Sequence, residues 1–466
     1  MKPAHSAFMI RRRLLLSVLP ALSALALAGC SGNSAPGGVP TTDATLAKSN
    51  LARVPSSAVA ASALLAATDA NNAFAVDLYG QVLKAPGVSA HNVLTSPISA
   101  SLALTMTMAG ANGQTASEMA AALHIDPSAS DSIYAGQNAL TQAFDARAAA
   151  AFANDSQNPK LDPSADDYQL QVVNSIWGEQ TYTWEAPFLD NLAENYGTGV
   201  YQEDFVHDFE PARAAINSWV SDYTKDKISD LLPEKSLDTR TRMVLVNALH
   251  LKMPWQRKFE ENATKVDSFT RGDGSVVSVD FMTQDEDCKY ADESDAQVIA
   301  VPLANRELSV VIVMPHVGVS LADYEAKLAV HAGALAVPTD SAQIGLSLPK
   351  TNFASPSFSL GDALKALGVT QAFDVNQADF SGLCAHPPNG EHLFLEDVFQ
   401  KATLSMQEGG VEAAAGTAAV VSGEGAAAPA PQKLKIDRPF VISIVDVPSG
   451  AVLMLGHIQD PTESGS

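Results

Sequence analysis

The feature of this chain that most constrains its fold is a plain segment near the C-terminal end. Residues 408–431 read EGGVEAAAGTAAVVSGEGAAAPAP, so small residues dominate and the first proline is Pro429. The segment separates two strongly patterned apolar stretches, residues 393–406 and 440–458. A connection of this length between two late core segments of a compact domain is uncommon, and it is usually either functional or disordered.

The same segment meets the conditions for a strand that enters a sheet. Proline cannot donate a hydrogen bond to a neighbouring strand, and none occurs between Pro388 and Pro429. Alternate side chains lie on opposite faces of a strand, so one face has to be small and uncharged to enter a core. That face would carry Val411, Ala413, Ala415, Thr417, Ala419 and Val421. The composition also fits a flexible linker, so the pattern alone leaves both interpretations open.

The length and charge of such a strand bear on what it could do. Residues 411–424 would span roughly 45 Å when extended, which is the width of a small domain. From Glu412 to Val420, the face opposite Val411 carries one charge, on Glu412. Insertion could therefore carry an attached partner from one end of the domain to the other, driven by new hydrogen bonds and burial in a sheet that was unfilled before.

Composition limits the class of protein. The chain has 466 residues, is 46% hydrophobic and carries a formal net charge of −23. This apolar content is enough for a large core, and the charge favours solubility. A nucleic-acid partner would need a clustered basic face, so the acidic balance argues against one.

The N-terminus has the pattern of a lipoprotein signal. Three arginines, residues 11–13, precede an apolar run at 14–29 that has the length of a signal-peptide core and is too short to span a membrane. The run ends in Leu-Ala-Gly-Cys, which resembles the bacterial lipobox cleaved before a lipidated cysteine, here Cys30. We expect a signal peptide at 1–29 and a lipid (palmitate-bearing) anchor on Cys30. The alternative is an ordinary signal peptide with a stray cysteine.

The predicted anchor implies a location and a tether. Ser31 stands where an aspartate would resemble an inner-membrane retention signal, so we expect an outer-membrane lipoprotein of the cell envelope, on the periplasmic or surface face, or an extracellular protein. Residues 30–66 are rich in Ser, Ala, Pro, Gly and Thr without apolar periodicity, which predicts a flexible tether. In an oxidising compartment Cys288 and Cys384 could pair, but burial as small free thiols is the favoured alternative.

Apolar periodicity predicts one α+β domain over residues 67–462. Helices dominate the first third and strands the remainder, with few strand-helix-strand units. Ser96 and Pro97 suit the start of a helix, and Thr115 with Glu118 has capping-box spacing. Helices are expected at 74–84, 97–109, 115–124, 211–225, 321–328 and 360–367. Strands are expected at 171–177, 243–251, 297–303, 308–314, 342–348, 393–399, 440–447 and 451–458.

Several short motifs along this domain together resemble the serpin family. They occur in the family's order over residues 66–461, nearly all of the chain after the predicted signal and tether. Each motif alone is weak, and the ordered set is specific. They are NVLTSPIS at 92–99, GANGQT at 110–115, LVNAL at 245–249 leading to Trp255, LPK at 348–350, ADFSG at 378–382, and DRPF at 437–440 with Gly456 beyond it.

The resemblance implies a fold of about nine helices around three β-sheets with an exposed reactive-centre loop at about 408–431. Such loops bait a serine protease, which cleaves the loop, stays acylated and is trapped when the loop inserts into the main sheet. The resemblance also implies a monomer. The hinge of the loop would comprise Glu408, Gly409, Gly410, Val411, Glu412, Ala413, Ala414 and Ala415.

The resemblance assigns further residues to the places where the main sheet must open. Ser96, Ser99, Asn247 and Gln400 would form the shutter, and Trp255 would lie in the breach. The family commonly has histidine where this chain has Gln400, which keeps hydrogen-bonding capacity but removes a titratable group. It usually has Thr or Ser where this chain has Val411, and an uncharged β-branched valine is compatible with insertion.

The cleaved bond is the least determined part of the loop. Counting seventeen residues from Glu408 gives Glu424-Gly425, whereas counting back from Pro439 gives a position near Ala428. Glu424 would suit a Glu-specific protease. The neighbouring valines and alanines would suit an elastase-like or subtilisin-like protease, and a cysteine protease is the less favoured target.

Two other functions compete with inhibition. A non-inhibitory member of the same fold could serve as a binding or structural surface lipoprotein, but the composition of the hinge favours inhibition. A hydrolase is disfavoured because the chain has neither a G-x-S-x-G nor an H-E-x-x-H motif, and its histidines lack ligand spacing. We therefore expect a protein that is not an enzyme and needs no cofactor or metal.

Overall fold

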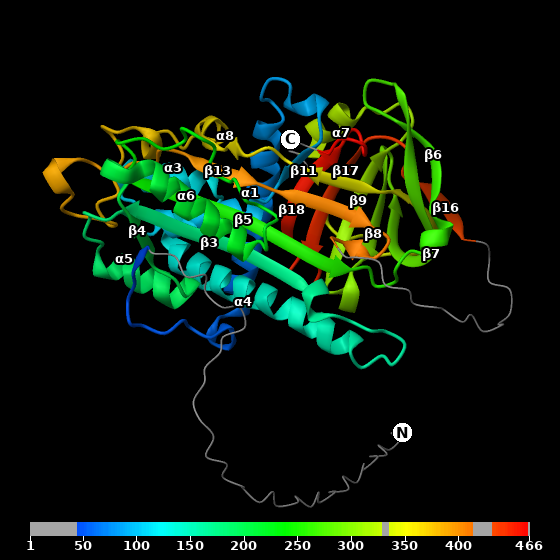
Figure 1. Ribbon diagram of the computed structural model, residues 1–466, viewed down its shortest axis with the longest axis horizontal. Coiled ribbons are helices and arrows are strands. Elements are labelled where there is room, and N and C mark those ends of the chain that lie inside the picture. The colour runs from blue at the N-terminus through cyan, green and yellow to red at the C-terminus, as the bar shows by residue number, and fades with distance from the viewer. Residues whose placement is uncertain (1–43, 329–334, 413–430, 465–466) are drawn as a thin grey trace, which may run out of the picture. The chain divides into compact units, whose positions relative to one another are not determined.

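Strands β3 (Gln169–Glu179) and β5 (Met243–Pro254) pair antiparallel at the centre of the first sheet. The computed structural model describes residues 44–328, 335–412 and 431–464, all within the compact unit 40–466 (Figure 1). β5 is apolar and buried along nearly its whole length, as expected for a strand covered on both faces. The sheet also contains β1 (Thr45–Ala47), β4 (Val200–Glu203), β11 (Thr351–Ala354), β12 (Phe358–Ser359), β13 (Val398–Lys401), β14 (Thr403–Gln407) and β15 (Gly410–Val411).

The second group of strands is organised around the long strand β7 (Val276–Asp292). β7 pairs with β6 (Lys265–Thr270) and β10 (Ser341–Pro349), and only its last residues pair with β8 (Ala296–Pro302). β7 thus joins two parts of the group that would otherwise be separate sheets. The other members are β2 (Val93–Thr95), β9 (Leu308–Pro315), β16 (Gln432–Lys435), β17 (Phe440–Asp446) and β18 (Ala451–Ile458).

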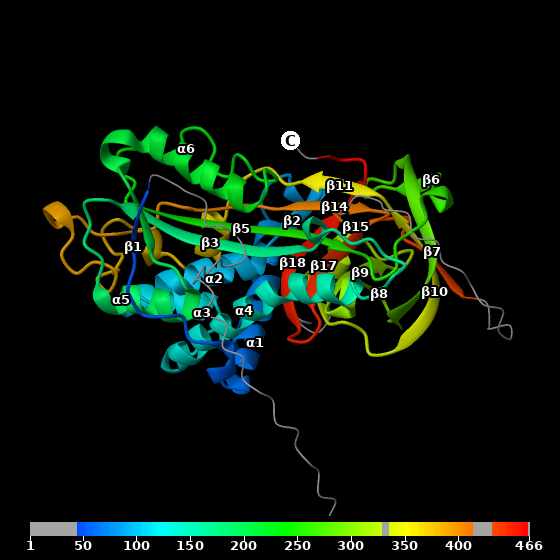
Figure 2. The same ribbon diagram turned by 60° about the horizontal axis from the view of Figure 1, so that its bottom comes forward.

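Helices cover both faces of the first sheet. α6 (Phe205–Tyr223) lies on one face of this sheet. α2 (Pro97–Met108), α3 (Gly113–Ala122) and α4 (Ser130–Asp155) lie on the other face (Figure 2). The helices are α1 (Ala61–Val82), α2 (Pro97–Met108), α3 (Gly113–Ala122), α4 (Ser130–Asp155), α5 (Ala186–Asn191), α6 (Phe205–Tyr223), α7 (Leu321–Leu328) and α8 (Gly361–Ala366).

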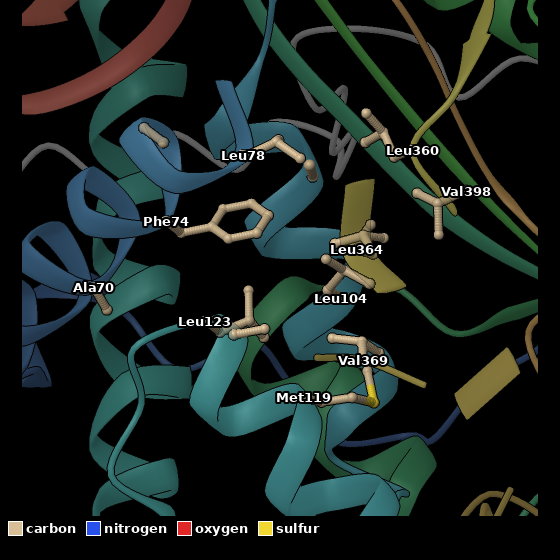
Figure 3. Close-up of a cluster of buried hydrophobic side chains, with 14 of the residues drawn as sticks. Ala70, Phe74, Leu78, Leu104, Met119, Leu123, Leu360, Leu364, Val369 and Val398 are labelled. Atoms are coloured by element: carbon tan, nitrogen blue, oxygen red, sulfur yellow. The ribbon is translucent and has the colours of Figure 1, made fainter. Parts of the chain in front are cut away.

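The largest apolar cluster lies where α1, α2, α3 and α8 meet. Phe74 of α1, Leu104 of α2 and Leu364 of α8 are fully or almost fully buried there, and Val398 at the start of β13 belongs to the same cluster (Figure 3). β13 is therefore fixed at one end by the main core.

Most of the predicted elements are present. The strands expected at 171–177, 243–251, 297–303, 308–314, 342–348, 440–447 and 451–458 are confirmed to within a few residues, as are the helices at 321–328 and 360–367. The strand expected at 393–399 is wrong for most of its length, because β13 begins only at Val398. Leu393 and Leu395 are buried in an irregular segment, and their alternation imitates a strand.

The starts of α3 and α6 differ from expectation, and α2 starts as expected but is capped differently. Ser96 stands at the N-cap of α2, but its hydroxyl lies within hydrogen-bond distance of Ser99 Oγ and Leu453 O and does not cap the helix. α3 begins at Gly113, and Thr115 Oγ1 accepts from the backbone of Asp379 instead of forming a capping box. α6 begins at Phe205, where Asp204 caps it by accepting from His207 N.

The segment assigned to a tether is partly ordered. β1 pairs with β4 at the edge of the first sheet, and α1 already begins at Ala61. Arg53 donates to Asn138 and Thr141 of α4. The part of the predicted tether from residue 44 onward therefore lies on the domain, because backbone pairing and the half-buried Arg53 hold a sequence that has no apolar periodicity.

Both internal cysteines are free and buried, so the disulfide alternative is not realised. Burial raises the pKa of the Cys288 thiol to about 12, and it also raises that of Cys384. Within the ranges described above, no helix is long and apolar enough to cross a membrane.

Candidate functional site: the hinge in the parted sheet

Strands β5 and β13 are paired at one end and separated at the other. Leu245–Ala248 of β5 pair in parallel with Val398–Lys401 of β13. Beyond this point the two-residue strand β15 lies between β5 and β14, with Val411 opposite Met253 on one side and Met406 on the other. The start of the predicted loop therefore already occupies the mouth of an opening in the sheet.

The backbone at Gly410 leaves no room for a side chain. A Cβ atom there would lie 2.3 Å from the carbonyl oxygen of Met253. The next residue, Val411, is 1% exposed and packs in the cluster that contains Met253, Leu404 and Met406. A glycine followed by an uncharged apolar residue is thus what this position requires.

Glu408 anchors the hinge at the open end of the sheet. Its carboxylate is 2.9 Å from Lys350 Nζ, and Thr264 Oγ1 donates to it at 2.8 Å. Burial alone would raise the pKa of Glu408, but the hydrogen bonds from Lys350 and Thr264 hold it below its ordinary value. The carboxylate is therefore ionised at neutral pH and fixes the first residue of the hinge.

Trp255 lies directly against the same segment. Its backbone N–H donates to Gly409 O and its Nε1–H donates to Gln407 O at 2.8 Å. The ring is 2% exposed and makes an edge contact with Phe259, whose N–H donates to Glu408 O. Trp255 thus binds the backbone on both sides of Glu408, through its indole at Gln407 and its main-chain N–H at Gly409.

The predicted shutter residues meet at the closed end of the opening. Gln400 Oε1 accepts from Ser96 N, and Gln400 Nε2 donates to Ser96 O and Asn247 Oδ1 at 2.9 Å each. Asn247 Nδ2 donates to Phe399 O. Ser99 Oγ, which accepts from Ser96 Oγ, donates to Ala248 O. The network joins α2, β5 and β13, so the strands cannot part without breaking it.

Glu412 lies at the fork between the paired and the separated ends. Its N–H donates to Ser405 O, and its φ of +51° is left-handed, so the chain turns here. Thr403 Oγ1 donates to Glu412 Oε1 at 3.0 Å, and Lys227 Nζ is 3.8 Å from Oε2. His250 Nδ1 is 3.6 Å from the same oxygen. A carboxylate, a histidine and a lysine thus meet where the strands diverge.

The structure brings the predicted residues into two groups. Glu408 to Glu412 lie with Trp255 at the open end, and Ser96, Ser99, Asn247 and Gln400 lie at the closed end. Ala413, Ala414, Ala415, Glu424, Gly425 and Cys30 fall outside the described residues. The roles assigned to all of these positions stay predictions.

Four residues of the site were missed from the sequence. His250 lies in the mostly apolar run 243–251, which predicts a buried strand and by itself indicates no role for a histidine. Lys350 belongs to a recognised motif but was given no role, and Thr403 and Lys227 carry no local signal. The sequence offered one indication of a functional residue, which is a polar side chain, His250, inside a strand that is otherwise apolar. Among the described side chains, no group of three His, Cys, Asp or Glu is arranged to hold a metal.

Comparison with known proteins gives a consistent set of similarities. The family model described as Serpin (serine protease inhibitor) matches residues 69–461. Human Serpin B3 is 30% identical over 410 residues, which cover 84% of this chain and 99% of the relative. Bovine leukocyte elastase inhibitor is 30% identical over 401 residues, covering 84% and 98%.

Solved structures show the same fold. The native structure of tengpin, a thermophilic serpin, has a TM-score of 0.72 at 24% identity and covers 90% of this chain and 99% of that one. Human thyroxine-binding globulin has a TM-score of 0.71 at 26% identity, covering 86% and 100%. The predicted α+β architecture is confirmed by these likenesses.

Proposed function

Because this chain belongs to the serpin family, we propose that it is a suicide-substrate inhibitor of a serine protease. The family contains protease inhibitors, among them the bovine leukocyte elastase inhibitor that resembles this chain. In the proposed reaction the protease serine attacks the carbonyl carbon of the bait bond, the peptide C–N bond breaks, and the new amine end leaves with the C-terminal piece. The N-terminal piece stays on the enzyme as an ester.

The observation that carries the proposal is the docked hinge. Gly410 and Val411 already pair with β5 and β14, and Val411 is buried in the same core as its neighbours. Extending this strand would add backbone hydrogen bonds and burial, which supplies the driving force for insertion. Once the loop is cut, its free end is able to continue along the opening that β15 has begun.

The target class follows from the residues near the bait bond. Glu424 supports a Glu-specific protease, and the surrounding alanines and valines support an elastase-like or subtilisin-like one. We favour the bond Glu424-Gly425 over a position near Ala428, and a serine protease over a cysteine protease. The chain is proposed to act as a monomer.

The test is the formation of a covalent complex that survives SDS. The mature chain is incubated with Glu-specific, elastase-like and subtilisin-like serine proteases, and mass spectrometry of the released C-terminal peptide identifies the bond. We expect an adduct with at least one protease and a strong rise in the melting temperature after cleavage. If every protease only digests the loop and cleavage leaves the melting temperature unchanged, the chain is a non-inhibitory member and the proposal fails.

Paired variants identify the bond. Glu424→Gln removes the charge at the favoured position and should abolish the adduct with a Glu-specific protease, while Ala428→Gln leaves it intact. Loss of the adduct with an elastase-like protease in Ala428→Gln but not in Glu424→Gln would instead place the bond at the later position.

We also propose that Cys30 carries the lipid that attaches the chain to the cell envelope, as an outer-membrane lipoprotein. The support is the Leu-Ala-Gly-Cys ending of the apolar run. Metabolic labelling with palmitate should label the wild type and leave Cys30→Ala unlabelled, whereas Cys288→Ala should keep the label. Labelling that persists in Cys30→Ala would refute the anchor.

A further inference from the structure

Two buried polar atoms at the fork of the sheet face each other without a hydrogen bond. Glu412 Oε2 and His250 Nδ1 are 3.6 Å apart, and neither has a hydrogen-bond partner among the described residues. Their side chains are 5% and 2% exposed, respectively. Buried polar atoms are normally paired, so this contact requires an explanation.

The tautomer of His250 is fixed by the hydrogen bond that its Nε2 makes with Gln169. Gln169 Nε2 donates to Asp166 O at 2.7 Å, which directs Gln169 Oε1 toward His250 Nε2 at 3.0 Å. An amide oxygen only accepts, so Nε2 of the neutral ring carries the hydrogen. His250 Nδ1 is therefore a bare acceptor, and it faces a carboxylate oxygen that is also an acceptor when ionised.

We propose that docking of the hinge takes up one proton from solvent at the Glu412–His250 contact, so that pH sets how firmly the hinge is held in the sheet. The proton stays on Glu412 Oε2, and this O–H group donates a hydrogen bond to His250 Nδ1. It supplies the hydrogen bond that both atoms lack. When the hinge leaves the sheet, Glu412 returns to solvent and releases the proton.

The charged groups around the contact come from four segments. Two lysines, Lys225 and Lys227, follow α6, and His250 and Lys252 belong to β5. Two carboxylates, Asp166 and Asp167, precede β3. The fourth segment, β14, contributes the uncharged hydroxyl of Thr403. Lys252 pairs with Asp167 at 2.7 Å and Lys225 with Asp166 at 3.4 Å. Two of the three lysines thus have carboxylates of their own, which leaves Lys227 at 3.8 Å as the one described cation in ion-pair contact with Glu412.

The directions of the pKa shifts agree with this geometry. Burial raises the pKa of Glu412 despite the attraction of Lys227 and the hydrogen bond from Thr403. Burial and the nearby lysines Lys227, Lys225 and Lys252 lower the pKa of His250 to about 4. The histidine is therefore neutral when the carboxyl group takes up its proton, and the proton belongs to Glu412.

The sign of the effect follows from linkage. A carboxyl group with a raised pKa in the docked state favours docking as the pH falls through that raised value, and the effect is complete near the ordinary value of about 4.3. One linked proton changes the docking equilibrium by at most about tenfold per pH unit. Docking is thus weaker at neutral and alkaline pH.

The test is amide hydrogen exchange of the whole mature chain without protease, between pH 5 and 8, corrected for intrinsic exchange rates. The reporters are the N–H groups of Glu412 and Trp255, which donate to Ser405 O and Gly409 O. We expect their protection to rise as the pH falls, by up to about tenfold per unit. Protection that is independent of pH would overturn the proposal.

Two glutamine variants sharpen the test. Glu412→Gln places a permanent N–H donor opposite His250 Nδ1, so its protection should be high and flat with pH. Glu396→Gln is the matched control, because burial also raises the pKa of Glu396 and its Oε2 also lacks a hydrogen bond to any described residue, but it precedes β13 and lies outside the hinge. It should behave like the wild type. A Glu412→Gln variant that retains the wild-type slope contradicts the proposal.

The proton uptake does not depend on inhibition, although its consequence rests on the proposed function. If the chain inhibits a protease, the rate of adduct formation should change with pH in the wild type, after correction for the enzyme's own pH profile, and stay level in Glu412→Gln. Absence of any adduct would end the proposed function while the exchange result stands. A pH-independent exchange result would end this inference while inhibition stands.

Discussion

The carbonyl oxygen of Met253 occupies the space that a side chain at Gly410 would need, since a Cβ atom built there lies 2.3 Å from it. The contact is with backbone, which cannot swing away as the end of a flexible side chain would. It makes Gly410 the residue that permits β15 to lie between β5 and β14.

Gly410→Ala should therefore expel the hinge. The Cβ clash has the character of overpacking, which costs about 1–3 kcal/mol, and release of β15 is the cheapest relief. Exchange of the Glu412 and Trp255 amides should accelerate. Gly80→Ala is the control, because nothing lies within 4 Å of a Cβ in that position of α1 and alanine should stabilise the helix by about 0.5–1 kcal/mol. Equal behaviour of the two variants would refute the steric role of Gly410.

A charge at Val411 should separate cleavage from trapping. Val411 is 1% exposed in an apolar cluster, and an unpaired buried charge is strongly unfavourable. We expect Val411→Arg to be cut by the target protease at a normal rate and to yield no SDS-stable adduct. Val317→Arg, at a valine that is 85% exposed, should still form the adduct. Adduct formation by Val411→Arg would show that insertion does not proceed through β15.

The ion pair between Lys350 and Glu408 should contribute to stability in a pH-dependent way. The lysine is 29% exposed and the glutamate 8%, so the pair lies between an exposed and a buried one, and Lys350→Met should lose about 1–3 kcal/mol. The pKa of Glu408 is lowered, so its stabilising contribution is present above the ordinary value of about 4.3 and is lost as the pH falls further.

The measurement is urea unfolding from pH 7 to pH 3. The wild type should lose stability over the acid part of this range more steeply than Lys350→Met. Arg240→Met removes an exposed pair with Asp238 and should leave the curve nearly unchanged. Parallel curves for the wild type and Lys350→Met would contradict the assignment.

The sequence predicted the residues of this site better than the contacts between them. Motifs far apart in the chain turn out to be each other's partners. Gly382 N donates to Gly110 O and Asn112 N donates to Asp379 O. A Cβ atom at Gly382 would lie 2.8 Å from Gly110 O, so the close approach of the two segments requires a glycine there. Neither pairing is visible in the spacing of a single chain, because it depends on tertiary contacts.

Misses of secondary structure have more than one cause. The buried residues Ile133, Gln137, Leu140 and Phe144 recur at helical spacing in α4, so that helix was predictable and was overlooked. β6 has mostly exposed side chains, and no apolar pattern could have identified it. The sequence also could not predict how many hinge residues pair with the sheet, because the same small residues are compatible with an exposed loop and with an inserted strand.

Gln400 gives the last prediction, because the closed end of the opening depends on its amide. Gln400 is fully buried, accepts from Ser96 N and donates to Ser96 O and Asn247 Oδ1. A histidine there has one N–H and one bare nitrogen when neutral, so Gln400→His should leave a partner unsatisfied and lose about 1–3 kcal/mol at pH 8. Burial should hold the pKa of the new imidazole below its ordinary value of about 6.5. The remaining stability of Gln400→His is then present above this ordinary value and falls as the pH drops through it, a dependence that the amide of the wild type does not confer.

Urea unfolding at pH 8 and pH 5.5 measures this difference in stability, with Gln157→His at an exposed position as the control. Equal pH dependence in the two histidine variants would show that the buried network tolerates a charge, and the assignment of Gln400 as the residue that fastens β13 to β5 and α2 would be wrong.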